Sequence, residues 1–103
     1  MSTDDEGYLV DPGDWSEAVA EAFAAREGLH LTDLHWRVLH FMREFHDEHQ
    51  VAADARFVIR FLAEECGLGA EARGRLFDLF PYGYVKQACR IAGMRRPRAW
   101  STG

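Results

Sequence analysis

The sequence predicts an all-α fold, an orthogonal bundle of about five helices preceded by a short N-terminal β strand or hairpin. Apolar residues recur at helical spacing in five segments of the chain. Most of these segments end at glycine or proline, and the links between them are short. At 103 residues the chain can form one hydrophobic core without disulfide or metal staples. We therefore expect a single domain over residues 1–103, with residues 94–103 as a C-terminal arm.

Composition narrows the class of protein. Hydrophobic residues make up 48% and charged residues 28% of the chain, which is typical of a globular domain. No apolar run approaches the roughly 18 residues of a membrane-spanning helix, and the acidic N-terminus does not resemble a signal peptide. We expect a cytoplasmic monomer without a membrane partner or a cofactor. In a reducing compartment, Cys66 and Cys89 are not expected to form a disulfide.

The net charge of the chain is −5, and the charged residues are distributed unevenly along it. Residues 1–54 contain thirteen acidic and three basic residues, whereas residues 55–103 contain four acidic and nine basic residues. The basic C-terminal half favours an anionic partner, such as an acidic protein, RNA or DNA. The alternative is that these side chains only form solvated helix faces.

The N-terminal third is expected to hold a strand and a helix. Gly7–Val10 is compatible with a short strand that ends in a turn at residues 11–13. We expect Asp14 to cap the first helix, with Glu17 three residues later, and the helix to end near Gly28. The apolar face of this helix would hold Trp15, Ala18, Val19, Ala22 and Phe23.

The second helix is expected to begin at Thr32 and to run to about residues 46–49. Apolar residues cover more than half of its circumference, which indicates a central, largely buried helix. Its four histidines are not spaced for a metal site, because only one pair shares a helix face and no further ligand is evident. We expect surface or N-capping roles for them, and no bound metal: His35, His40, His46 and His49.

Two further helices follow. Asp54 is expected to cap the third helix, which ends at Gly67, and a fourth helix over about residues 70–80 ends at Pro81. The fourth helix would bury Ala72, Leu76, Phe77 and Phe80. This pair of helices around a glycine turn is also compatible with a helix-turn-helix motif, which makes DNA an alternative partner. The overall acidity of the chain argues against strong DNA binding.

The last helix has both of its ends marked in the sequence. Pro81 and Gly83 interrupt the preceding helix, and Gly93 stands where a left-handed C-terminal residue is favoured. The apolar positions recur at i, i+3, i+4 and i+7: Val85, Ala88, Cys89 and Ala92. Cys89 therefore lies on the packed side of this helix, below an arm that is rich in arginine.

This C-terminal segment, Phe80-Pro81 through Lys86-Gln87 and Arg90-Ile91-Ala92-Gly93 to Pro97, resembles the signature of the DsrC/TusE family of sulfur-relay proteins. The likeness covers nearly the whole chain. It implies a DsrC-like helical fold and a small protein that accepts or carries persulfide sulfur between partners, in sulfur metabolism or tRNA 2-thiolation. The partners so implied are a donor complex of the TusBCD or DsrEFH type, a sulfite reductase or a tRNA thiolase.

The chain departs from the family at one position. In the family the sulfur-carrying cysteine is the penultimate residue, eleven positions after the place that Cys89 occupies. Trp100 stands at that distance in this sequence, and no cysteine follows Cys89. The resemblance makes Cys89 the candidate sulfur-carrying thiol, and Lys86 three residues earlier is a candidate thiolate partner. The helix C-terminus opposes an anion at this place, and Cys89 is alternatively a small core residue.

Candidate partner-binding residues gather near the C-terminus: Arg90, Arg95, Arg96, Arg98 and Trp100. The indole of Trp100 would dock over Cys89 or anchor a partner. The missing thiol also leaves a second functional hypothesis, a non-catalytic paralogue that regulates sulfur metabolism by docking to partners or binding DNA.

Overall fold

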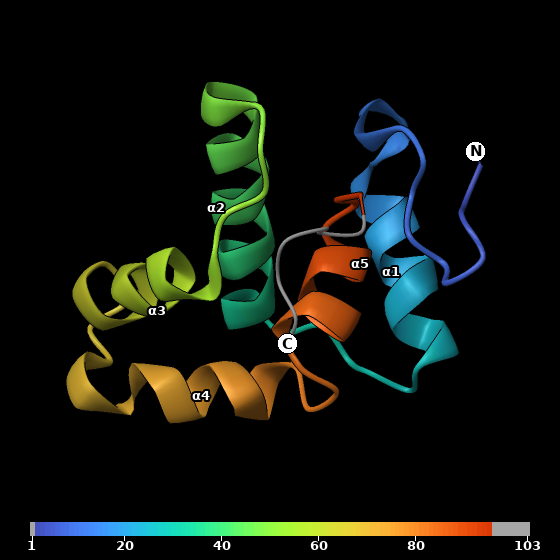
Figure 1. Ribbon diagram of the computed structural model, residues 1–103. Coiled ribbons are helices and arrows are strands. Elements are labelled where there is room, and N and C mark those ends of the chain that lie inside the picture. The colour runs from blue at the N-terminus through green and yellow to red at the C-terminus, as the bar shows by residue number, and fades with distance from the viewer. Residues whose placement is uncertain (1, 96–103) are drawn as a thin grey trace.

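The computed structural model describes residues 2–95, and their secondary structure is helical (Figure 1). The elements follow in the order η1 (Pro12–Asp14), α1 (Glu17–Arg26), α2 (Asp33–His49), α3 (Ala55–Glu64), η2 (Gly69–Glu71), α4 (Ala72–Leu79), η3 (Tyr84–Ala88) and α5 (Cys89–Ile91). The first two η elements are 3₁₀ turns, and η3 is a π-helical turn. The predicted all-α class is confirmed. Within residues 2–95 no helix is long and apolar enough to cross a membrane.

The predicted N-terminal strand does not form in the described residues. A single antiparallel bridge joins Thr3 to Leu9. The Asp4 carboxylate accepts hydrogen bonds from the backbone N–H groups of Glu6 and Tyr8, which shapes the segment as a turn. Tyr8 and Leu9 are buried. The segment is therefore held by packing against the helices and not by pairing in a sheet.

The start of α1 differs from the prediction. Ser16 is the N-cap, and its hydroxyl accepts a hydrogen bond from the Val19 N–H at 3.3 Å. Asp14 belongs to η1. Phe23 is buried as predicted, and Trp15 and Val19 pack partly buried against the core. The helix also buries two residues outside the predicted face: Ala20 and Ala24.

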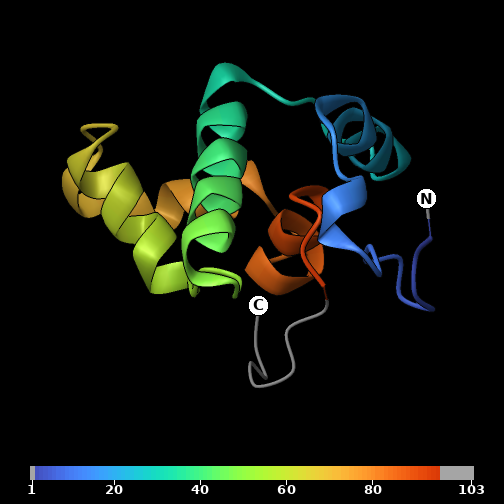
Figure 2. The ribbon, with the colours of Figure 1, turned by 90° about the horizontal axis from the view of Figure 1, so that it is seen from above.

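Helix α2 is central, as predicted. Val38, Leu39 and Met42 are completely buried. Figures 1 and 2 show α2 between two helix pairs, α3 with α4 on one side and α1 with α5 on the other. Thr32 is the N-cap, at the predicted position.

Helices α3 and α4 pack against each other. Asp54 caps α3 as expected, because its carboxylate accepts a hydrogen bond from the Arg56 N–H at 2.8 Å. Helix α4 buries Ala72, Leu76 and Leu79. The prediction that Phe77 is in the core is wrong, since Phe77 is 46% exposed. Its position is rotated by one residue from the buried i, i+4, i+7 row.

Candidate functional site

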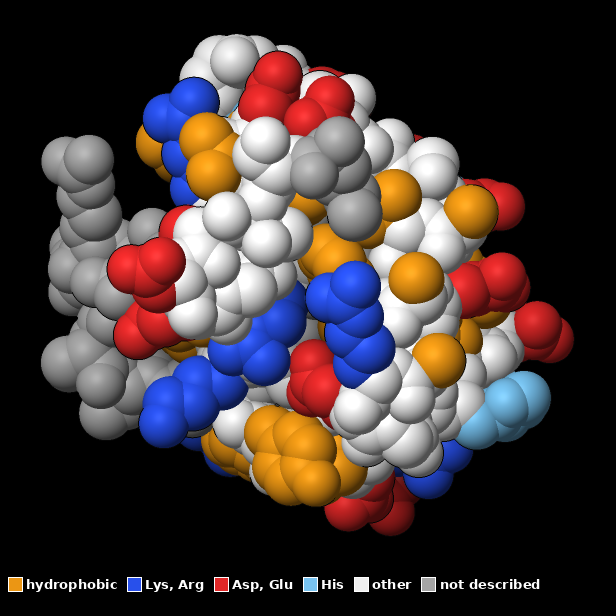
Figure 3. Space-filling model, turned by 90° about the vertical axis from the view of Figure 1, so that its right-hand side faces the viewer, with side chains coloured by type: hydrophobic (Ala, Val, Ile, Leu, Met, Phe, Trp, Pro, Cys, Tyr) orange, Lys and Arg blue, Asp and Glu red, His pale blue; other side chains and the backbone are white. Residues whose placement is uncertain are grey.

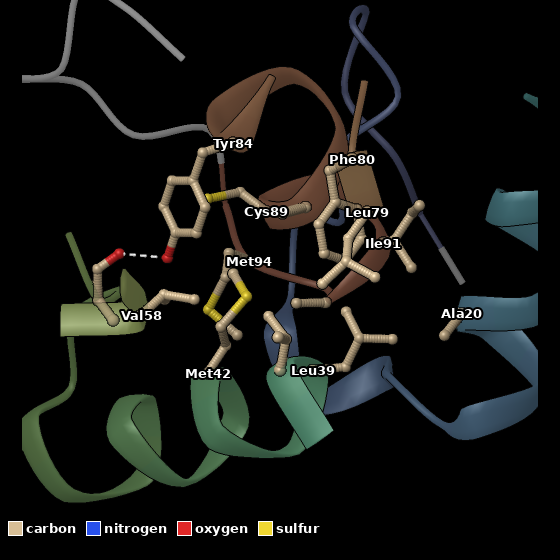
Figure 4. Close-up of a cluster of buried hydrophobic side chains, with 14 of the residues drawn as sticks. Ala20, Leu39, Met42, Val58, Leu79, Phe80, Tyr84, Cys89, Ile91 and Met94 are labelled. Atoms are coloured by element: carbon tan, nitrogen blue, oxygen red, sulfur yellow. Dashed lines mark hydrogen bonds between the residues drawn. The ribbon is translucent and has the colours of Figure 1, made fainter. Parts of the chain in front are cut away.

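Cys89 is completely buried at the first residue of α5. Its sulfur points toward the ring of Tyr84, within a cluster that includes Met42 of α2 and Met94 (Figure 4). The Tyr84 hydroxyl donates a hydrogen bond to the carbonyl oxygen of Ala53. The tyrosine that covers the thiol is therefore itself tied to the chain before α3.

Burial raises the pKa of Cys89 to about 12, and a hydrogen bond with Tyr84 lowers it by a smaller amount. With that pKa, about one thiol in a hundred thousand is ionised at neutral pH. The thiolate is the nucleophilic form of cysteine. In this conformation the thiol is therefore both covered and protonated.

Lys86, the predicted thiolate partner, lies outside this cover. Lys86, in η3, is exposed, and Tyr84 is the group that hydrogen-bonds the thiol. Cys66 lies just beyond α3, is partly exposed, and is a free thiol like Cys89. Cys89 therefore has a neutral hydroxyl beside it in this structure.

Arg90 is used within the fold. Its guanidinium lies 3.5 Å from the Glu27 carboxylate and above the ring of Tyr8, at 5.1 Å from the ring centre. Glu27 also accepts a hydrogen bond from the Gln87 amide at 2.8 Å. These contacts join α5 to α1 and to the N-terminal segment. The Arg90 guanidinium is therefore engaged within the fold and not directed at a partner.

Of the other candidate partner-binding residues, the structure describes one. Arg95 is exposed, and its Nε donates a hydrogen bond to the Val10 carbonyl oxygen at 2.9 Å. Arg96, Arg98 and Trp100 lie outside the described residues. On the face formed by α1 and the N-terminal segment, acidic, basic and hydrophobic side chains are mixed (Figure 3).

Sequence reasoning missed the residues that hold the chain where it leaves α5. The indole N–H of Trp15 donates to the Ile91 carbonyl oxygen at 2.9 Å. The Arg43 guanidinium donates to the Ala92 carbonyl oxygen at 3.1 Å and to that of Pro12 at 2.9 Å. A helix end leaves carbonyl groups without partners, but nothing local in the sequence identifies their donors.

The histidines of α2 were expected to have surface or N-capping roles. No group of three His, Cys, Asp or Glu side chains within residues 2–95 could hold a metal ion. His35 has the expected capping role, because its Nδ1 accepts the Thr32 N–H at 3.0 Å. Its Nε2 then carries the proton and donates to the Leu79 carbonyl oxygen at 2.7 Å.

Comparison with known proteins identifies the family. The protein-family model described as "DsrC like protein" matches residues 1–99. The chain belongs to the DsrC-like family. Its curated relatives include proteins named sulfurtransferase TusE from Sodalis glossinidius, 41% identical over 97 residues, and from Salmonella typhimurium, 42% identical over 97 residues. These alignments cover 94% of this chain and 90% and 89% of the two relatives.

Solved DsrC structures share the fold. The DsrC of Allochromatium vinosum is 37% identical and superposes with a TM-score of 0.82, over 95% of this chain and 88% of that chain. Oxidised DsrC from Archaeoglobus fulgidus, the gamma-subunit of dissimilatory sulfite reductase, is 29% identical with a TM-score of 0.81, over 97% and 91% of the two chains. The predicted sulfur-relay family is confirmed.

Proposed function

We propose that this chain works in sulfur relay, and that Cys89 accepts a persulfide sulfur when docking to a partner uncovers it. Family membership over residues 1–99, together with sulfurtransferase relatives of about 40% identity, supports the relay. Cys89 is favoured as the acceptor because it lies in the terminal helix at the base of the predicted arm. Cys66, the other cysteine, lies just beyond α3.

The transfer step is a thiol–persulfide exchange. After loss of its proton to solvent, the Cys89 thiolate attacks the outer sulfur of a persulfide on the donor. A new sulfur–sulfur bond forms at Cys89, the sulfur–sulfur bond of the donor breaks, and the donor leaves as a thiolate. The bound sulfur is then open to attack by the thiolate of the next acceptor, and no external oxidant or reductant is needed.

Because the Cys89 thiol is buried, this exchange requires a conformational change that exposes it. The closed conformation must open at Tyr84 or Met94 before a donor can reach the sulfur, and exposure to water would then bring the pKa of Cys89 toward its ordinary value. A protein partner supplies the binding energy for such an opening when it prefers the open form. We place this relay in the cytoplasm, with the protein acting as a monomer.

Partners follow from the proposed relay. A persulfide-donating complex of the TusBCD or DsrEFH type would load the protein, and a sulfite reductase or a tRNA thiolase would receive the sulfur. The relatives named as sulfurtransferases support a transfer role, and the likeness to a sulfite reductase gamma-subunit favours the reductase as acceptor.

The sealed thiol favours a second candidate function, docking to the same partners without sulfur carriage. In that case the fold supplies a binding surface and regulates the relay by competition. The burial of Cys89 and its raised pKa are the observations that support this alternative.

Mass spectrometry after incubation with a persulfide-loaded donor protein distinguishes the two functions. Carriage predicts a mass gain of one sulfur atom in the native protein and in Cys66→Ala, and no gain in Cys89→Ala. The same donor with its persulfide removed is the control. Binding to the donor without any sulfur adduct would reject carriage and leave the docking function.

A further inference from the structure

We infer that Trp15 and Arg43 anchor the base of the C-terminal arm, and that Arg43 is a positioning residue for sulfur relay. The base is defined here as residues 91–95, the last described part of the chain. The anchor itself rests on contacts in the structure, and only its role in relay rests on the proposed function. Neither residue was a candidate from the sequence.

The Arg43 side chain links three segments. Its two terminal nitrogens donate to the carbonyl oxygens of Ala92 and Pro12, and a longer contact of 3.5 Å reaches the Gly93 carbonyl oxygen. Burial lowers the pKa of Arg43, and the nearby Asp47 carboxylate partly opposes this effect. A cation at the unpaired carbonyl groups of a helix end is electrostatically favourable.

Trp15 closes the other side of the base. The Arg43 guanidinium lies 4.8 Å from the centre of its ring, and its indole N–H bonds Ile91. Gly93 has φ +77°, and a Cβ there would lie 2.4 Å from Cδ1 of Trp15. The indole therefore fills the place that any side chain at residue 93 would need. The glycine serves both the left-handed backbone and this close approach.

The anchor fixes the chain at the start of the arm. Met94, one residue after the glycine, is completely buried, and its N–H donates to the Cys89 carbonyl oxygen at 3.0 Å. Arg95 is held by the Val10 carbonyl oxygen. These contacts hold residues 91–95 against the body of the protein. The same contacts keep Met94 within the cluster that encloses the Cys89 thiol.

Amide hydrogen exchange tests the anchor directly. Arg43→Ala is expected to speed exchange at Gly93 and Met94 by about tenfold or more, while the amides of Val58 and Leu62 in α3 keep their protection. Arg43→Lys retains the charge but cannot donate to two carbonyl groups as a planar fork, so it should restore the protection only in part.

Arg37→Ala is the matched control. Arg37 lies on the same helix, donates to a backbone carbonyl oxygen at Glu65, and stands over the ring of Phe61, away from the arm. Equal exchange at Gly93 in Arg37→Ala and Arg43→Ala would overturn the anchor. So would a uniform loss of protection that includes α3, because it would show a general effect on stability.

Trp15→Phe provides a second variant if Arg43→Ala does not fold. It removes the indole N–H but retains an aromatic ring, and exchange near Ile91 and Gly93 should rise. Unchanged exchange in this variant would remove Trp15 from the anchor.

Cys89 alkylation connects the anchor to relay. In a Cys66→Ala background, iodoacetamide should modify Cys89 at least severalfold faster in Arg43→Ala than in Arg37→Ala, because Met94 is released. Equal rates would reject the role of the anchor in covering the thiol. If persulfide loading fails while both exchange and alkylation respond, the anchor stands and the proposed carriage falls.

Discussion

At the residue scale, two buried titratable side chains, Cys89 and His35, are held in their neutral forms. Cys89 and His35 are both buried, and burial disfavours the charged form of each, raising the pKa of the thiol and lowering that of the imidazole. His35 is hydrogen-bonded on both ring nitrogens, to Thr32 and to Leu79. It therefore ties the start of α2 to the end of α4 only in its neutral form.

The stability of the protein should fall in acid because of His35. Its folded-state pKa is lowered from 6.5 by burial, so below about pH 6.5 the unfolded chain binds the extra proton first. Unfolding free energy should then decrease with falling pH, by at most about 1.4 kcal/mol per pH unit for one proton. Urea unfolding between pH 7.5 and pH 5 measures this slope.

Two glutamine variants separate His35 from the other histidines. His35→Gln should be less stable at pH 7 but should lose much of the acid slope, because the amide does not titrate. His40→Gln is the matched control, since His40 is exposed on the same helix and pairs with Glu17 at 3.0 Å. Equal acid slopes in the two variants would contradict the assignment to His35.

At the element scale, helix ends and aromatic contacts decide the arrangement. Phe41 of α2 stacks on Phe61 of α3 with 4.5 Å between ring centres, and Phe45 meets Phe57 at 5.1 Å. These pairs join the two helices along one side. The π-helical turn η3 opens the entry into α5 and places Tyr84 over Cys89. A regular helix over the same residues was predicted, whereas residues Tyr84–Ala88 form the wider π-helical turn.

Helix α1 offers a direct comparison of two possible caps. Ser16→Ala should destabilise the protein by about 1 kcal/mol, because the Val19 N–H loses its side-chain acceptor. Asp14→Ala should have a smaller effect, since Asp14 lies in the preceding turn η1. Thermal unfolding of the two variants measures the difference. A larger loss in Asp14→Ala would favour the cap predicted from the sequence.

At the scale of the whole molecule, the two ends of the described chain are packed together. The Tyr8 hydroxyl donates to the Val85 carbonyl oxygen at 2.9 Å, and Leu9 is buried. Trp15 and Arg95 add contacts between the first fifteen residues and the segment after α5. This closure supplies long-range contacts that fix the base of the arm.

Alkaline solution should open this closed core. Burial is the largest cause of the raised pKa values of Tyr8, Tyr84 and Cys89. The folded state retains these protons after the unfolded chain has lost them, so their stabilisation is complete below about pH 9 and declines as pH rises toward 12. Unfolding free energy measured from pH 8 to pH 11 should therefore fall.

Single variants identify which residues cause the fall in unfolding free energy at alkaline pH. Tyr8→Phe and Cys89→Ala should each flatten it, although each also costs stability at pH 8 through a lost hydrogen bond or a cavity. Tyr82→Phe is the control because Tyr82 is 64% exposed. If Tyr82→Phe flattened the slope as strongly as the other two, burial would not be its cause.

The local features of this protein can be predicted from its amino-acid sequence. Helical periodicity located the helices, Thr32 and Asp54 marked two helix starts, and Gly93 marked the last helix end. The C-terminal signature indicated the family that the comparisons confirm. These features are readable because each depends on residues a few positions apart, within one helical turn or one cap.

The burial and the protonation of the Cys89 thiol depend on contacts between distant parts of the chain. The cover of Tyr84 over Cys89 depends on a hydrogen bond to Ala53, 31 residues away, and the arm base depends on Arg43, 49 residues from the carbonyl that it holds. Spacing along the chain does not encode such contacts, because they arise when separate helices pack. The sequence placed a thiol on the packed side of a helix, and packing sealed it and raised its pKa.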